Sequence, residues 1–226
     1  MFRLLPLLFA IGAGLVAWHF STWRTLKDLN SRSNPLVDAD LLALCERMAR
    51  ALGVARVPVR IYEVAAINGL AAPDGQIFLT RGFYERYRSG AVTAEEMASV
   101  IAHELGHVAL GHARRRMIDF SAQNAMRAVL AAVLTRLVPG VGVWLADMVT
   151  SLLAARLSRQ DEYEADAYGA ALLTKAGIGT GPQLSLLRKL MAMGGASGPA
   201  WLMSHPATPE RIAAVERLTS RWGQPG

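Results

Sequence analysis

Two histidines and a glutamate at helical spacing are the residues that can do chemistry in this sequence. His103-Glu104-Leu105-Gly106-His107 reads H-E-x-x-H, and residues four apart lie on one face of a helix. Two neutral imidazoles in this arrangement bind one Zn²⁺ ion at roughly 2.0–2.1 Å each. Glu104 lies about a quarter of a turn around the helix from the histidines. From there it can reach a water bound to the metal without binding the metal itself. That position suits a general base.

The helix that must carry these side chains has a clear start. Thr93 is followed three residues later by Glu96, which is the pattern of a capping box. Beyond it, apolar residues recur close to the helical period, at Met97, Val100, Ile101, Leu105 and Val108.

A zinc site needs a third ligand, and a second helix downstream offers it. Glu162 and Asp166 are four residues apart and share one face. A carboxylate completes a His-His-Glu site, and the second acid can accept the remaining N–H of a ligating imidazole. An isolated H-E-x-x-H also occurs by chance in ordinary helices, but the acidic helix makes that interpretation much weaker.

The chain resembles the family of membrane zinc metallopeptidases that includes HtpX, the type I CAAX prenyl protease, and the OMA-type and BepA-type quality-control proteases. The resemblance rests on residues 68–82, the H-E-x-x-H helix, residues 158–166 and residues 205–212. It implies a zincin-like fold, in which zinc is bound by His103, His107 and Glu162, Glu104 is the catalytic base and Asp166 supports a ligand.

The last of these blocks adds two residues to the candidate active site. His205 precedes Pro206, and the resemblance implies that it either stabilises the oxyanion or occupies the open zinc position as an inhibitory ligand. Arg211 lies one turn into a helix that Thr208 caps and Pro209 begins. The resemblance gives it two alternatives, binding a carboxylate or polarising the intermediate.

Residues 57–64 and 76–80 read as strands, with a turn at Pro73-Asp74-Gly75 between them. They form either a hairpin that packs on the helices or an edge to which an extended polypeptide substrate pairs. The resemblance favours the edge. The candidate substrate-binding residues are Asn68, Ala71, Ala72, Gln76 and Phe78.

Length and composition describe one domain, or one domain with an appendage. The chain has 226 residues, of which 52% are hydrophobic, and its net charge is +6. The high hydrophobic content and the positive net charge fit contact with anionic lipid. The sequence contains no nucleic-acid-binding motif that would offer another use for the positive charge. Cys45 is the only cysteine, so no intrachain disulfide forms, and its place on a helix over residues 38–52 predicts a core residue.

Residues 1–24 are expected to form a transmembrane anchor or a signal sequence, because residues 4–23 contain no Asp, Glu, Lys or Arg. A polar linker over 25–37 and the zinc metallopeptidase domain over 38–222 follow. We expect a single-pass anchor in the inner membrane. Counting basic residues places the domain in the cytoplasm, whereas the resemblance places it in the periplasm or envelope.

Residues 118–157 are strongly apolar and break at Pro139-Gly140, which predicts two joined helices. They are either plain core helices or a hairpin that covers the active site or dips into the membrane surface. Two further helices are expected, one bearing Glu162 and ending at Gly177 and one over residues 182–193. His112 would face away from His107 on a continuous helix, so we do not expect it to bind the metal.

The sequence therefore predicts a mainly helical α+β protein, a zincin-like metallopeptidase with a small sheet, acting on misfolded or envelope proteins. The alternative is a catalytically idle zinc protein that acts as a chaperone or scaffold for unfolded envelope proteins. A prenyl-peptide protease is a third option, but it requires an intramembrane chamber of several spanning helices that this sequence does not supply. Nothing in the sequence sets the oligomeric state.

Overall fold

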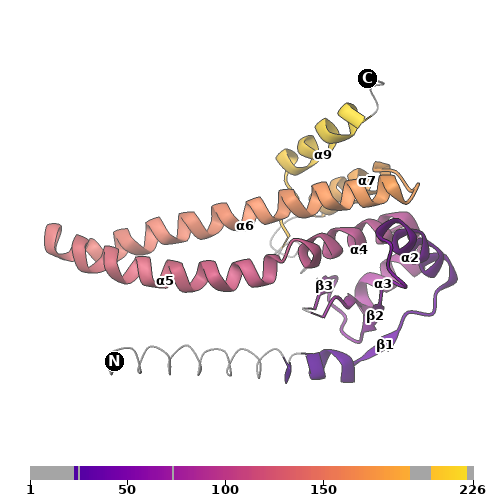
Figure 1. The fold of residues 1–226 in the computed structure, drawn as a ribbon, viewed down its shortest axis with the longest axis horizontal. Helices are drawn as coiled ribbons and strands as arrows, with labels where there is room; N and C mark the ends of the chain where they lie inside the picture. Colours follow the sequence, from indigo (N-terminus) through magenta and orange to yellow (C-terminus); the bar gives the residue numbers. More distant parts are fainter. Residues whose placement is uncertain (1–22, 25, 73, 194–204, 223–226) are drawn as a thin grey trace.

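The computed structural model describes residues 23–24, 26–72, 74–193 and 205–222. The expected anchor or signal segment lies almost wholly outside these residues. Within them, most residues are helical and one four-stranded sheet is present, so the chain is a mainly helical α+β protein as expected (Figure 1). None of the described helices combines the length and the apolar character that crossing a membrane demands.

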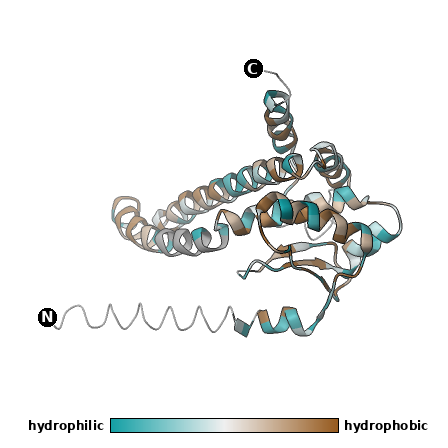
Figure 2. Cartoon of the chain, turned by 45° about the vertical axis from the view of Figure 1, so that its right-hand side comes forward, coloured by the Kyte–Doolittle hydropathy of each residue, from teal (hydrophilic) through white to brown (hydrophobic). Residues whose placement is uncertain are grey.

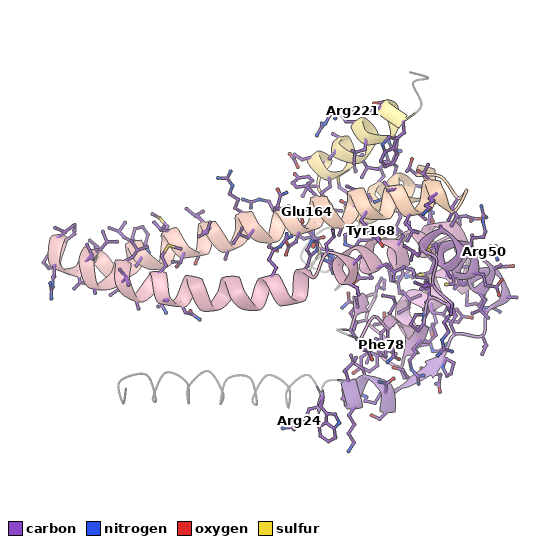
Figure 3. The ribbon with its side chains drawn as sticks, in the orientation of Figure 1. Arg24, Arg50, Phe78, Glu164, Tyr168 and Arg221 are labelled. Carbon is purple, nitrogen blue, oxygen red and sulfur yellow. The ribbon has the colours of Figure 1, made fainter. Side chains whose placement is uncertain are left out.

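Two long helices, α5 (His112–Leu137) and α6 (Gly142–Lys175), form a hairpin that projects from the rest of the molecule (Figures 1 and 2). The predicted break at Pro139-Gly140 is confirmed, with Gly140 in the left-handed region at φ 88°. Glu162 belongs to this same α6, which runs on into the body of the molecule. Glu164 marks the part of α6 that lies near the start of α5 (Figure 3).

The outer part of the hairpin does not fit plain core helices. Leu137 is 72% exposed and Trp144 is 63% exposed. Figure 2 shows apolar residues gathered at the tip. Nine further large apolar side chains of the hairpin are also exposed, at Met126, Val129, Val133, Val138, Val141, Val143, Met148, Val149 and Leu152.

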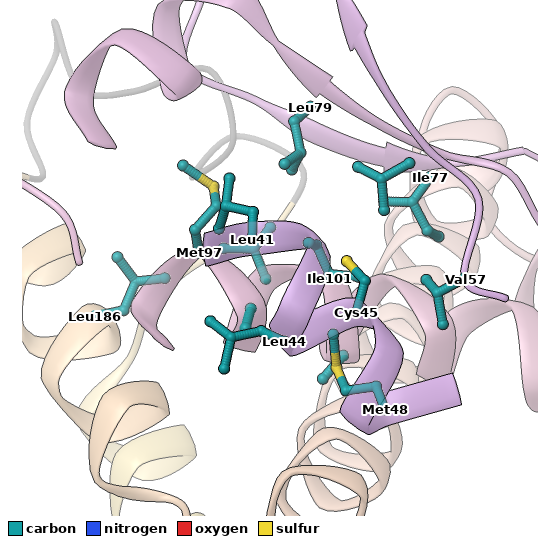
Figure 4. Packing of buried hydrophobic residues seen from close by; sticks show 14 of the residues in the cluster. Leu41, Leu44, Cys45, Met48, Val57, Ile77, Leu79, Met97, Ile101 and Leu186 are labelled. Atoms are coloured by element: carbon teal, nitrogen blue, oxygen red, sulfur yellow. The ribbon is translucent and has the colours of Figure 1, made fainter. Parts of the chain in front are cut away.

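The core is built on α2 (Ala39–Leu52), which forms where the sequence predicts it. The Asp38 side chain accepts a hydrogen bond from the Leu41 N–H at 3.1 Å, and Gly53 ends the helix at φ 70°. Leu41 and Met48 are fully buried in the cluster shown in Figure 4. Cys45 lies in the same cluster, and burial raises the pKa of its thiol to about 12.

The sheet has the strand order β1-β2-β4-β3. Its strands are β1 (Ser33–Pro35), β2 (Val59–Tyr62), β3 (Gly69–Ala71) and β4 (Ile77–Thr80). The hairpin alternative is wrong, because β2 and β4 pair in parallel and β3 pairs antiparallel with β4. β3 is only three residues long, which is too short to show an alternating pattern in the sequence.

The N-terminal flank is more ordered than a linker. Ser33–Pro35, which composition assigns to the linker over 25–37, pairs antiparallel with β2. Leu29 is buried against Ala72 and Phe78, and Leu36 is buried in the main core. Isolated apolar residues in a polar stretch thus anchor this segment, and their spacing carries no helical or strand period.

Of the remaining described helices, two pack on the sheet and two pack on other helices. α3 (Arg81–Arg88) follows β4 directly, and α4 (Ala94–Ala109) contains the H-E-x-x-H residues. The predicted capping box is confirmed, since the Glu96 N–H donates to Thr93 Oγ1 at 3.1 Å and the Thr93 N–H donates to Glu96 Oε2 at 2.9 Å. α7 (Gly181–Ala192) and α9 (Pro209–Trp222) lie close to the predicted ranges.

Candidate metal centre

Four side chains from two helices and a loop converge at the centre of the molecule. His103 Nε2 lies 3.1 Å from His107 Nε2, and each of these nitrogens lies 3.4 Å from an oxygen of Glu162. His205 joins them, with Nδ1 3.3 Å from His103 Nε2 and 3.0 Å from Glu162 Oε2. One donor atom from each of the four residues lies within 4.8 Å of the others, and three of the residues are buried.

These distances fit a tetrahedral metal site. Donors held at roughly 2.0–2.1 Å from a tetrahedral Zn²⁺ ion are separated by roughly 3.3–3.4 Å. Spacings of 3.1 to 3.4 Å between the imidazole nitrogens and the Glu162 oxygens are close to that value. Two imidazoles and a carboxylate are also the donor set of a catalytic zinc site with a fourth position for a water or substrate.

Small residues allow the two ligand-bearing helices to approach closely. A side chain at Gly106 would place its Cβ 3.0 Å from the Ala165 backbone, and one at Gly169 would place its Cβ 3.3 Å from the backbone nitrogen of His103. Glycine at both positions removes that obstacle. The backbone of α4 therefore lies directly against α6, which brings Glu162 within reach of the two histidines.

The far nitrogen of His103 is held by a buried ion pair. His103 Nδ1 lies 3.0 Å from Asp166 Oδ1, and Arg211 donates to both Asp166 oxygens at 2.6 and 2.8 Å. Burial lowers the pKa of His103, but Asp166 and Glu162 outweigh it and raise that pKa to about 9. A metal ion bound at Nε2 would therefore displace a proton from His103.

Arg211 lies at the centre, and its guanidinium group contacts other residues of this chain. Besides Asp166, Arg211 donates to the Pro206 carbonyl at 2.8 Å and lies 3.2 Å from Glu162 Oε2. Its side chain is only 3% exposed. Of the two roles expected for Arg211, its contacts agree with carboxylate binding, and the carboxylates are those of Asp166 and Glu162 in this chain.

Glu104 and His205 face each other across the site. Glu104 is 2% exposed, and its Oε1 lies 3.6 Å from His205 Nε2. Because His205 Nδ1 is directed at Glu162 and His103, this imidazole stands where a fourth ligand would be. Burial raises the pKa of Glu162, but hydrogen bonds from three histidines hold it well below its usual range.

The candidate substrate-binding residues divide between the two faces of the sheet. Gly69 packs on α4, where an added Cβ would lie 3.7 Å from Glu104, and alternation directs Ala71 to the same face. The Phe78 and Ala72 side chains are buried against Leu29 on the other face, so they do not face a substrate.

The remaining two candidates make local contacts. Gln76 donates to Asp74 Oδ2 at 2.6 Å. The Asn68 Oδ1 accepts from the Gly69 N–H at 3.0 Å, and its backbone N–H donates to Thr80 Oγ1 at 2.8 Å. Asn68 therefore fixes the start of β3.

The structure adds His112, which sequence reasoning placed away from the metal on a continuous helix. α4 ends at Ala109, and Gly111 turns the chain at φ 66° before α5 begins at His112. His112 Nδ1 then lies 2.7 Å from His107 Nδ1. Gly111 is the signal that was available in the sequence, because glycine commonly ends a helix.

Comparison with known proteins agrees with this geometry. The sequence profile of Peptidase family M48 matches residues 35–219. Metalloprotease YcaL of Escherichia coli (strain K12) is 30% identical over 184 residues, covering 77% of this chain and 68% of YcaL. Metalloprotease LoiP of the same organism is 31% identical over 168 residues, covering 74% of this chain and 64% of LoiP.

A third relative covers more of the chain. Protease HtpX of Stenotrophomonas maltophilia (strain K279a) is 26% identical over 255 aligned positions, covering 94% of this chain and 85% of HtpX. The profile match spans most of the chain and includes each of the four side chains that converge at the centre. This chain therefore belongs to Peptidase family M48.

Proposed function

We propose that this protein is a zinc-dependent metalloendopeptidase that cleaves misfolded or membrane-associated envelope proteins. The observation that carries the proposal is the convergence of His103, His107 and Glu162 at tetrahedral spacing, with Glu104 buried beside them. Family M48 membership and the metalloprotease relatives support the peptidase reaction.

The side chains of this centre divide the work of peptide hydrolysis. When bound, zinc supplies Lewis-acid polarisation of the scissile carbonyl and lowers the pKa of a water molecule. Glu104 takes the proton of the attacking water and passes it to the leaving amine. Asp166 and Arg211 hold the His103 imidazole in the orientation that directs Nε2 toward the metal.

His205 closes the site in this conformation. Its Nδ1 occupies the side of the cluster left open by the two helices, so a substrate carbonyl and a water must displace it. Of the two roles left open by the sequence, these contacts favour the inhibitory ligand.

An extended polypeptide is the substrate that the sheet suits. β3 is the terminal strand of the sheet formed by the described residues, and its Gly69 packs on the metal-bearing α4. A substrate strand pairing with β3 would run beside the metal centre. Main-chain pairing needs no particular side chain, which fits cleavage of unfolded proteins of varied sequence.

We propose that cleavage takes place at a membrane surface. Residues 4–23 contain no Asp, Glu, Lys or Arg, and the outer part of the α5–α6 hairpin exposes eleven large apolar side chains among the described residues. Arg136 is exposed among them, and the net charge of the chain is +6. Apolar insertion combined with positive charge is the chemistry that binds anionic lipid.

Replacing Glu104 by glutamine tests the peptidase proposal. The variant should bind as much zinc as the wild type and digest an unfolded casein-type substrate at least about 10³-fold more slowly, because the base is lost and the ligands remain. Glu95→Gln is the matched control, since Glu95 is an exposed residue in the first turn of the same helix.

The same assay separates the alternatives. A wild-type protein that binds zinc but cleaves nothing, with or without added metal, would favour the chaperone or scaffold. Full activity in Glu104→Gln would sink the assignment of the base. Chelator treatment should abolish cleavage, and re-addition of zinc should restore it.

A further inference from the structure

His112 is a buried histidine in contact with a metal ligand, yet peptide hydrolysis as described assigns it no part. It is 1% exposed and is the first residue of α5. Its Nδ1 lies 2.7 Å from His107 Nδ1, and its Nε2 lies 3.2 Å from Glu164 Oε2 and 3.8 Å from Asp161 Oδ1. The ring therefore connects a metal ligand to two carboxylates of α6.

The direction of the hydrogen bonds follows from the metal centre. His107 Nε2 is directed at the cluster, 3.4 Å from Glu162 Oε1, and needs its lone pair to bind a metal ion. The proton of neutral His107 is then on Nδ1, from which it is donated to His112 Nδ1. His112 in turn carries its own proton on Nε2 and donates it to Glu164.

The Glu164 carboxylate that accepts this hydrogen bond is itself held by an arginine, which also contacts Asp161. Arg115 Nη1 lies 2.8 Å from Glu164 Oε2 and 3.2 Å from Asp161 Oδ1. The series Arg115, Glu164, His112 and His107 thus parallels the series Arg211, Asp166 and His103 at the same centre. In each series an arginine holds an acid, although a second imidazole stands between the acid and His107.

We infer that His112 is a positioning residue for the metal centre: its Nδ1 accepts a hydrogen bond from the His107 Nδ1–H and so fixes the tautomer and orientation of His107. The inference rests on the proposed metal-dependent function. Hydrogen bonds of this kind around metal ligands raise metal affinity, and their loss costs about 10–100-fold in affinity.

A second metal ion is the competing explanation, because donor atoms of His112, Asp161 and Glu164 lie within 4.8 Å of one another. The observed contacts argue against it. The guanidinium of Arg115 already contacts both carboxylates at 2.8 and 3.2 Å. The Nδ1 of His112 is also engaged by His107. A cation placed there would be repelled by the arginine.

Two substitutions of similar size separate positioning from packing. In His112→Asn, the amide oxygen replaces Nδ1 as acceptor for His107, whereas His112→Leu offers no acceptor. Zinc dissociation constants are measured by competition with a chromophoric chelator in full-length protein carrying Glu104→Gln to prevent self-digestion. We expect His112→Leu to weaken zinc binding about 10–100-fold and His112→Asn to remain within about threefold of the parent.

Unfolding of the zinc-free proteins and the zinc content per chain complete the test. Similar unfolding temperatures for both variants, with affinity lost only in His112→Leu, support the inference. Equal affinity in all three proteins, equal losses in both variants, or a second zinc ion per chain in the parent would overturn it. If the parent binds no zinc, the proposed function fails as well, whereas one tightly bound ion unaffected by His112→Leu overturns only this inference.

A measurement on zinc-loaded protein without a substitution at His112 keeps the inference testable if a variant does not fold. Nuclear magnetic resonance of protein labelled with ¹⁵N at histidine reports which ring nitrogen carries the proton. Protons on His107 Nδ1 and His112 Nε2 are expected. A proton on His112 Nδ1 would overturn the inference.

Discussion

His205 stands in the place that water and substrate need, and this decides what its removal should do. If the imidazole is an inhibitory ligand, His205→Ala opens the fourth position and raises the rate of casein cleavage, with zinc content unchanged. We expect the cleavage rate to rise about threefold or more, because the imidazole that competes with water and substrate contributes roughly the free energy of one hydrogen bond. A loss of activity at full zinc content would instead place His205 in catalysis.

Glu96 is a second residue whose contacts give a measurable prediction. It is 3% exposed, accepts hydrogen bonds from Lys189, Ser185 and the Thr93 N–H, and fixes the start of the metal-bearing helix. Burial raises the pKa of Glu96, but these hydrogen bonds outweigh it and hold the pKa below its usual value of 4.5.

The sign of the pH effect follows from that direction. A carboxylate whose pKa is lower in the folded state stabilises the protein above the unfolded pKa, and this stability is lost as the pH falls through the lower, folded value. Glu96→Gln should lower the free energy of unfolding by about 1–2 kcal/mol near neutral pH. The loss is modest because Lys189 is partly exposed, so solvent screens its ion pair with Glu96.

Denaturant unfolding from about pH 6 down to about pH 3 measures this effect. The difference between wild type and Glu96→Gln should shrink as the pH falls below 4.5, the usual carboxyl pKa. Exposed Glu95, changed to glutamine, is the control and should show little difference at any pH. A difference that stays constant with pH would contradict the proposed role of the Glu96 charge.

At the scale of elements, β3 is placed by its pairing with β4. The Ala72 N–H donates to the Gln76 carbonyl and the Thr80 N–H to the Asn68 carbonyl. Bonded and non-bonded positions alternate in an antiparallel pair. The backbone groups of Ala71 therefore point away from β4, on the side where a substrate strand would pair.

Ala71→Pro tests this edge because proline has no backbone N–H and is tolerated in terminal strands. With one main-chain hydrogen bond to the substrate lost, kcat/KM for an unfolded substrate should fall about threefold to tenfold, mainly through KM. Ala71→Val keeps the N–H and is the control. Equal kinetics for both variants, at unchanged unfolding temperatures, would remove β3 from the substrate site.

For the molecule as a whole, the α5–α6 hairpin raises the question of where the protein works. Its apolar tip lies at the opposite end of the molecule from Arg50 (Figure 3). A patch of this extent on a soluble domain usually marks a contact with a protein or a membrane. If lipid covers the tip, membrane binding and the metal centre are linked through one helix, α6.

A fluorescent label distinguishes insertion of the tip from attachment by the N-terminal segment. An environment-sensitive dye attached at Leu137→Cys, in a Cys45→Ser background, should shift to shorter wavelengths on adding anionic lipid vesicles. The same dye at exposed Arg50→Cys is the control and should not shift, although the N-terminal segment is present in both. No shift at residue 137 would argue that the tip does not enter the bilayer.

The sequence alone predicted the side chains that converge at the centre and most of the helices. A spacing of four places His103 and His107 on one helical face whatever the tertiary fold, and capping residues locate helix starts at Thr93 and Thr208. These are local relations, set by helix geometry within a few residues. The break at Pro139-Gly140 within an apolar stretch, also a local signal, predicted the two joined helices.

Tertiary structure decided what depends on chain reversal and on contacts between distant segments. Contacts between distant segments determine that β2 pairs in parallel with β4 and that Ser33–Pro35 forms a strand. Such short strands have no sequence period from which their pairing could be predicted. The convergence of Glu162 on the histidines depends on close approach of α4 and α6 at Gly106. His112 reaches His107 because the chain turns at Gly111, so the interruption of the helix decides their contact and the continuous helical spacing does not.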